Sequence, residues 1–253
     1  MYFFKELHRR NKWLFWFGLF NLLIAVVLIL LMQVENTQIL GVNRWLKPYK
    51  FYASVGIMSL TMGWLMYYLD NSKAVKSSSI AICISMFFEN GLILLQAIRG
   101  TTSHFNNSSS YNSTVFSLMG IAIIVFTITC IRICIRFFLQ KKFTIPSSYV
   151  WGIRLGILFF ILFSLEGGIM ISMMKHTVGA ADGGPGILLF NWSTAHGDLR
   201  IAHFLGIHSL QVLSLMGFYV ARTKTQAIIF SLVYVALVTV VLIQALSGIS
   251  LFS

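Results

Sequence analysis

The stretch WLFWFGLFNLLIAVVLILLM, residues 13–32, decides the fold. Asn21 is its single strongly polar residue, and about 20 consecutive apolar residues are what a helix needs to cross a hydrocarbon core about 30 Å thick. The backbone inside a bilayer must satisfy its own hydrogen bonds, which favours a helix over an irregular segment. Residues 13–32 therefore predict a membrane-spanning helix.

The composition of the whole chain extends this interpretation. Of its 253 residues, 57% are hydrophobic and 10% are charged, whereas an ordinary soluble domain has about 25% charged residues. These values exclude a soluble globular fold, a disordered chain and a disulfide-stapled secreted domain. Lys and Arg number 19 against 7 Asp and Glu. Such an excess is typical of segments that face anionic headgroups, so we expect membrane lipid, and not nucleic acid, as a partner.

Seven apolar segments predict an all-α integral membrane protein, a bundle of about seven transmembrane helices that forms one domain over residues 1–253. Thirteen of the 19 Lys and Arg fall on the side of the membrane that would hold the N-terminus, and six fall on the opposite side. This bias predicts a cytoplasmic N-terminus and a C-terminus outside. The expected spans are about 13–33, 51–69, 78–98, 115–138, 150–173, 200–221 and 226–249.

Glu89 lies near the middle of the third expected span, where burying a charge costs about 2.5 kcal/mol or more. Gln96 follows two helical turns later on the same face, and Arg99 and His104 lie beyond the end of the span. One interpretation is a polar track that holds a proton, an ion or a substrate. The other is a buried hydrogen-bond network that fixes helix packing. The sequence leaves both open.

The sixth expected span carries two histidines, His203 and His208, after Asp198 and Arg200. His208 and Gln211 share a helix face. His203 and His208 are about 140° apart on an ideal helix, so they would not ligate one metal without a π-bulge. Asp198 fits two roles, a catalytic acid or the N-cap of the helix.

Four strings carry a resemblance to known proteins. They are Trp45-x-Lys47-Pro48-x-Lys50-Phe51, Ser103-His104-Phe105-Asn106, Asp182-Gly183-Gly184-Pro185-Gly186, and Gly197-Asp198-Leu199-Arg200-x-x-His203-Phe204-x-Gly206-x-His208-x-x-Gln211. Over residues 41–220 the chain resembles a widespread family of uncharacterised bacterial multi-pass membrane proteins. The resemblance implies a bacterial inner membrane and no particular activity. It marks the polar residues of these strings as motif positions and leaves Glu166 and His196 outside the pattern.

The leading functional hypothesis is a membrane-embedded enzyme, dependent on a transition metal or haem, that acts on a lipid or a small molecule in an outward-facing pocket. We expect catalytic roles for Glu89, His104, Asp198, His203 and His208, and metal ligation by His104, His203 and His208. We expect ligand binding by Lys47, Lys50, Gln96, Asn106, Asp182, Arg200 and Gln211.

Two other functions stay open. One is a proton-coupled small-molecule carrier or channel that uses Glu89, although the sequence contains no inverted repeat and no clearly broken pair of helices. The other is an accessory or sensor membrane protein whose polar centre is purely structural.

Overall fold

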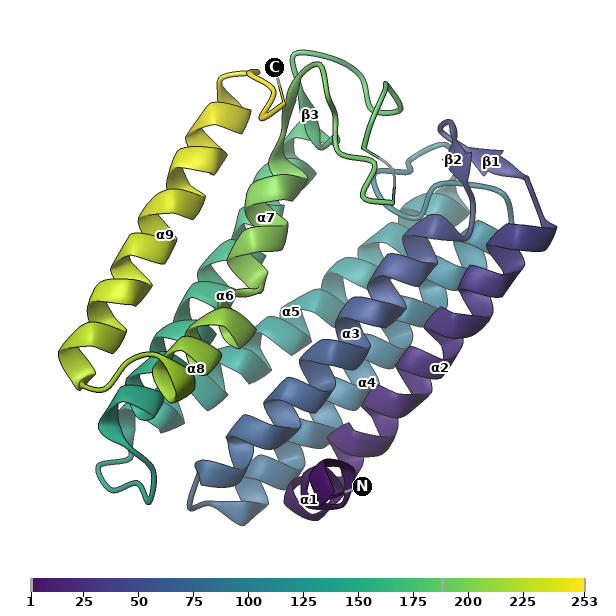
Figure 1. Ribbon diagram of the computed structural model, residues 1–253. Coiled ribbons are helices and arrows are strands. Elements are labelled where there is room, and N and C mark those ends of the chain that lie inside the picture. The colour runs from purple at the N-terminus through teal and green to yellow at the C-terminus, as the bar shows by residue number, and fades with distance from the viewer. Residues whose placement is uncertain (1, 188, 253) are drawn as a thin grey trace. The chain divides into compact units, whose positions relative to one another are not determined.

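The computed structural model describes residues 2–187 and 189–252, and helices make up most of this part of the chain (Figure 1). The predicted all-α class is confirmed. The helices are α1 Tyr2–Arg10, α2 Lys12–Val34, α3 Leu46–Leu65, α4 Ser72–Ile98, α5 Ser110–Leu139, α6 Ser147–Met173, α7 Leu199–Ile207, α8 Ser209–Tyr219 and α9 Lys224–Leu246, with a 3₁₀ turn, η1, at Met66–Tyr68.

The prediction of seven spans is wrong. Within the described residues five helices, α2, α4, α5, α6 and α9, are long and apolar enough to cross a membrane, and a sixth span results if α7 and α8 are counted together. The second expected span, 51–69, corresponds to α3 and η1. α3 is long enough but not apolar enough, since it begins at Leu46 and so includes Lys47 and Lys50.

The expected sixth span is broken. α7 and α8 meet at His208 and are bent by 42° with respect to each other. The expectation of no clearly broken pair of helices is therefore wrong, and Gly206, a residue type that is common at kinks, lies two residues before the break. The cytoplasmic N-terminus and the outside C-terminus stay predictions.

Side chains before the helices explain where several of them begin. Asn11 precedes α2 and accepts a hydrogen bond from the Leu14 amide, and Asn71 caps α4 in the same way through the Ala74 amide. Thr223 and Gln226 form a reciprocal capping box at the start of α9. Each cap satisfies an amide that the helix leaves without an internal partner.

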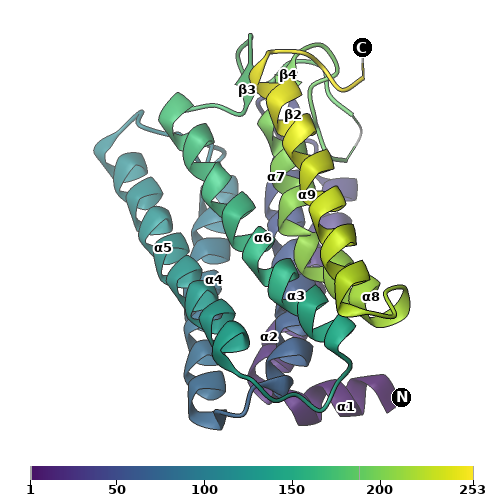
Figure 2. The same cartoon turned by 90° about the vertical axis from the view of Figure 1, so that its left-hand side faces the viewer.

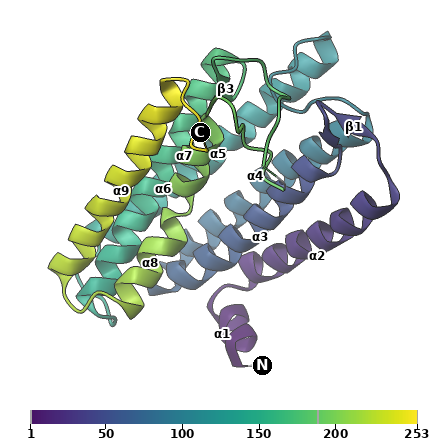
Figure 3. The ribbon, with the colours of Figure 1, turned by 45° about the horizontal axis from the view of Figure 1, so that its top comes forward.

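By internal contacts the chain divides into two compact units, and the single-domain prediction stays a prediction. Unit 1 is Met1–Arg136 and unit 2 is Phe137–Ser253. In unit 1 α2, α3 and α4 pack side by side (Figures 1 and 3), and α1 lies crosswise to α2 (Figure 2). Gly18 and Gly56 face each other, each with its missing Cβ position 3.2 Å from the other's carbonyl oxygen. Small residues at this crossing let α2 and α3 approach closely.

Unit 2 consists of α6, α7, α8 and α9 together with the last residues of α5. α6 packs against the other three helices, and Phe159, Phe163, Leu213 and Val238 belong to its buried core. Two short antiparallel strands, β3 Thr177–Val178 and β4 Gly197–Asp198, join the ends of the long loop between α6 and α7. In unit 1, β1 Gln38–Ile39 and β2 Val42–Asn43 form a similar small hairpin.

Candidate functional site

Glu89 is the most deeply buried carboxyl group of unit 1, with 1% of its side chain exposed. Neither carboxyl oxygen has a hydrogen-bond donor among the described residues. The next residue, Asn90, shows what a packing contact looks like here, because its amide donates to Oδ1 of Asn21 at 2.7 Å across the α2–α4 interface. Buried polar groups in proteins are almost always hydrogen-bonded, so Glu89 is an exception that a packing role does not explain.

His104 is the ionisable side chain that faces Glu89. Its Nε2 lies 3.8 Å from Oε1 of Glu89, and its side chain is 23% exposed. Three phenylalanine rings surround the imidazole, with ring centroids 5.5 Å away for Phe51, 6.1 Å for Phe105 and 6.3 Å for Phe116. The imidazole, which belongs to the partly exposed loop 99–109, therefore lies against the buried carboxyl group, near aromatic rings that also suit an imidazolium cation.

Lys47 and Lys50 lie in the first turns of α3 and are both partly buried. Lys47 interacts electrostatically with Glu89. The structure thus brings together three of the predicted site residues, Lys47, Glu89 and His104, within unit 1.

Gln96 and Asn106, predicted as ligand-binding residues, belong to a hydrogen-bond network. Gln96 donates to Oδ1 of Asn112 at 3.0 Å, and Arg99 donates to both of these residues at 2.6 and 2.9 Å. Ser108 connects Asn112 to Asn106 through bonds of 2.8 and 2.7 Å. This network ties the loop that carries His104 to α4 and α5, so these residues position the loop.

In unit 2, Asp198 is buried and caps α7. Its carboxylate accepts hydrogen bonds from the amides of Ser193 and Arg200 at 2.8 and 3.0 Å. The guanidinium of Arg200 donates to both oxygens of Asp198 at 2.9 and 2.6 Å, and to the Asn191 carbonyl. Asp198 and Arg200 therefore hold the loop between α6 and α7, as the N-cap interpretation predicts.

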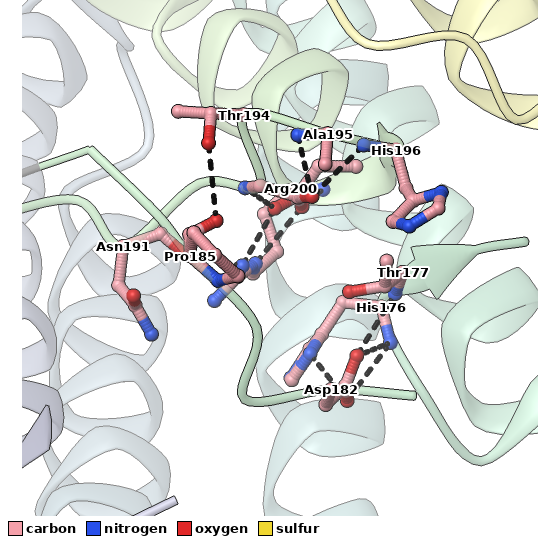
Figure 4. A network of polar contacts seen from close by, with 11 residues as sticks. His176, Thr177, Asp182, Pro185, Asn191, Thr194, Ala195, His196 and Arg200 are labelled. Carbon is pink, nitrogen blue, oxygen red and sulfur yellow. Dashed lines mark hydrogen bonds and ion pairs between the residues drawn. The ribbon is translucent and has the colours of Figure 1, made fainter. Parts of the chain in front are cut away.

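Asp182 holds the other half of the same loop. Its carboxylate accepts bonds from the amides of His176 and Thr177 at 3.2 and 3.0 Å and lies 2.6 Å from Nδ1 of His176 (Figure 4). Burial raises the pKa of Asp182, but the hydrogen bonds and the charge of His176 lower it by more, and the pKa lies well below its usual range. Asp182 is thus a structural anchor of the loop.

A small cavity of about 110 Å³ lies within this loop. Arg200 and His196 contribute its ionisable groups, and small residues form most of the remaining wall. The lining residues are Thr177, Ala180, Ala181, Gly183, Gly184, Pro185, Asn191, Ser193, Ala195, His196 and Arg200.

His203 pairs with Glu166, a residue that sequence reasoning left out of the site. Nδ1 of His203 lies 3.0 Å from Oε2 of Glu166, whose side chain is 4% exposed. Oε1 of Glu166 has no partner among the described residues. The two residues are 37 positions apart on different helices, so no spacing rule connects them. The signal available in the sequence was an acid inside an apolar segment.

His208 lies at the break between α7 and α8 and uses Nδ1 to bond the Phe204 carbonyl at 2.7 Å. Gln211 follows in the first turn of α8, where its backbone N–H donates to the His208 carbonyl. Within residues 2–187 and 189–252 no group of three or more His, Cys, Asp or Glu side chains is arranged to hold a metal ion. The predicted ligation of a metal or haem by His104, His203 and His208 is therefore not supported.

Comparisons with protein-family models, with curated proteins and with solved structures found no match to this chain. No family is identified, and the resemblance carried by the four motif strings stays a prediction. Helix length and composition support a multi-pass helical membrane protein, and its spanning helices imply contact with lipid.

Proposed function

We propose that the protein is a proton-coupled small-molecule carrier of the membrane, in which Glu89 takes up and releases the proton. The observation that carries this proposal is the state of the Glu89 carboxyl group. It lies in an apolar helix, is 1% exposed, and has no hydrogen-bond donor within the described structure. Ionisable groups inside membrane spans are characteristic of proton relays and transport pathways.

His104 supplies the connection to water. The separation of 3.8 Å from Nε2 of His104 to Glu89 is too long for a hydrogen bond, and a small rotation of either side chain or one bridging water closes it. The imidazole changes charge near neutral pH, which suits a group that passes protons. Lys47 interacts electrostatically with Glu89 and favours its negative charge while the proton is absent.

Two features of the backbone support a carrier in particular. α3, which carries Lys47, is too polar to count as an ordinary lipid-facing span. α7 and α8 form a bent pair at His208, and discontinuous helices are a recurring feature of secondary transporters. The hypothesis of a metal- or haem-dependent enzyme is not carried further, since its ligand set is not supported.

A hydrophobic carbodiimide tests proton binding without knowledge of the substrate, because it reacts with protonated carboxyl groups in apolar surroundings. We expect the purified full-length chain to be labelled at Glu89 and not at Glu35, which accepts bonds from Trp45 and Thr37 at 2.8 and 3.0 Å. Peptide mass spectrometry reads the sites.

Proton movement is measured in vesicles with a pH-sensitive dye inside and a potassium diffusion potential. A panel of amino acids, sugars and small organic acids is supplied outside. We expect flux that Glu89→Gln abolishes, that His104→Gln lowers at least about tenfold, and that the matched change Glu35→Gln leaves intact. Flux that requires a member of the panel indicates a carrier, and flux without it indicates a channel. Absence of both Glu89 labelling and Glu89-dependent flux would contradict the proposal.

A further inference from the structure

Unit 2 contains a second buried carboxyl group next to an imidazole, independent of Glu89. Glu166 lies in the C-terminal third of α6, which ends at Met173, and His203 lies in the middle of α7. Their 3.0 Å contact joins Oε2 to Nδ1, and it requires a proton between the two atoms. With Glu166 ionised, Nδ1 of His203 carries that proton and donates it.

The other two polar atoms of the pair are unused. Oε1 of Glu166 is buried without a partner, and Nε2 of His203 makes no hydrogen bond within the described residues. The His203 side chain is 30% exposed, so Nε2 is the more accessible of the two atoms. Gly167 lies next to the imidazole, since a Cβ at this position would be in van der Waals contact with Cε1 of His203 at 3.5 Å.

We infer that Glu166 and His203 form a proton-exchange site of their own. His203 takes a proton from water at Nε2 and becomes an imidazolium, while its Nδ1–H stays on Glu166, and the reverse step returns the proton to water. A carboxylate that fixes one ring nitrogen and leaves the other open is the arrangement that orients a general base. Glu166 is the positioning residue and stabilises the cation that forms.

Charged and titratable groups on the surrounding elements are held by other partners. Lys175 donates to the Ala180 carbonyl at 3.5 Å, and Arg200 bonds Asp198. Nδ1 of His208 bonds the Phe204 carbonyl, and the Tyr234 hydroxyl of α9 donates to the Leu205 carbonyl at 2.5 Å. Arg154 bonds the carbonyls of Phe137 and Gln140, near the start of α6. Glu166 is therefore the group that sets the charge next to His203.

Nitrogen NMR of the full-length chain with ¹⁵N-labelled histidine, in lipid nanodiscs, tests this inference. The protein has six histidines, and His203→Gln identifies the His203 signals. We expect neutral His203 to carry its proton on Nδ1 and to gain a second proton at Nε2 as the pH is lowered. A proton on Nε2 of the neutral ring, or no second proton at any pH at which the protein stays folded, overturns the inference.

Glu166→Gln keeps an acceptor for Nδ1 and removes the negative charge. We expect the ratio of doubly to singly protonated His203 near neutral pH to fall roughly tenfold, while His208, bonded to a backbone carbonyl, keeps its signals. An unchanged ratio also overturns the inference, because a merely structural hydrogen bond survives this substitution. If the variant does not fold, the wild-type spectra decide alone. Because the measured signals are those of His203, the outcome of this test does not depend on whether Glu89 carries protons.

Discussion

The imidazole of His104 faces a carboxyl group that has no hydrogen-bond donor in the described structure, with Nε2 of His104 3.8 Å from Oε1 of Glu89. Carboxylates elsewhere in unit 1 have donors, as Glu6 has in Arg9 and Arg10 at 2.7 and 2.8 Å. The contrast matters because an ion pair gains stability only when its remaining lone pairs are also satisfied. This arrangement favours the proposed exchange of a proton between Glu89 and His104 over a stabilising ion pair.

Substitutions of Glu89 should depend strongly on charge. Glu89→Lys places a cation beside Lys47 and His104 with no acceptor nearby, and an uncompensated buried charge costs about 3–5 kcal/mol. Glu89→Leu removes the charge and should leave the free energy of unfolding nearly unchanged. The stability of the two variants is compared by thermal unfolding in detergent, which is monitored by size-exclusion chromatography. Equal stability of both variants would show that position 89 is open to water.

Asp198 should act as a structural cap, in contrast to its predicted catalytic role. Asp198→Ala removes the acceptor of the Ser193 and Arg200 amides and leaves the Arg200 guanidinium without its carboxylate. We expect the free energy of unfolding to fall by about 3–5 kcal/mol. Asp70→Ala, at an exposed position, should cost under about 1 kcal/mol. Equal melting temperatures for the two variants would return Asp198 to the catalytic candidates.

The sequence predicts where the helices of this fold lie better than it predicts which of them are membrane spans. Apolar runs place α2 and α6 within a few residues, because length and hydropathy are local properties. The start of α3 at Leu46 was missed, since Pro48 and two lysines resemble a loop although proline is tolerated in the first turn of a helix.

Pairings between helices were harder to predict. The sequence placed Glu89 and His104 on one helix and its following loop, so their proximity follows from chain order. The contact between Glu166 and His203 depends on how α6 packs against α7, which no periodicity within either helix encodes. That Glu89, His104, His203 and His208 gather in one pocket stays a prediction.

The loop between α6 and α7 should loosen in acid. Because the folded-state pKa of Asp182 is lowered, its contacts stabilise the loop above the unfolded pKa of about 3.9, and this stabilisation is lost as the pH falls through the folded-state pKa. Near neutral pH we expect Asp182→Asn to speed hydrogen exchange of the Thr177 amide about tenfold. The Ser193 amide, held by Asp198, is the internal control.

With intrinsic exchange rates subtracted, the difference between wild type and Asp182→Asn should shrink only below about pH 3.9. A difference that is already lost near pH 6 would assign the effect to His176, the partner of Asp182, instead.

Packing between α6 and α8 should tolerate no side chain at Gly152. A Cβ there would meet the Leu213 carbonyl oxygen and would lie 3.1 Å from the Cα of Gly217, so the backbone of one helix must move. We expect Gly152→Ala to lower the free energy of unfolding by about 1–3 kcal/mol, the usual cost of overpacking. Gly120→Ala in α5 is the matched control, because a Cβ there meets nothing within 4 Å. Alanine favours helix over glycine by up to about 1 kcal/mol, so the control should be neutral or stabilising. Differential scanning fluorimetry in detergent separates the two variants, and a Gly152→Ala protein as stable as Gly120→Ala would mean that α6 and α8 lie farther apart than described.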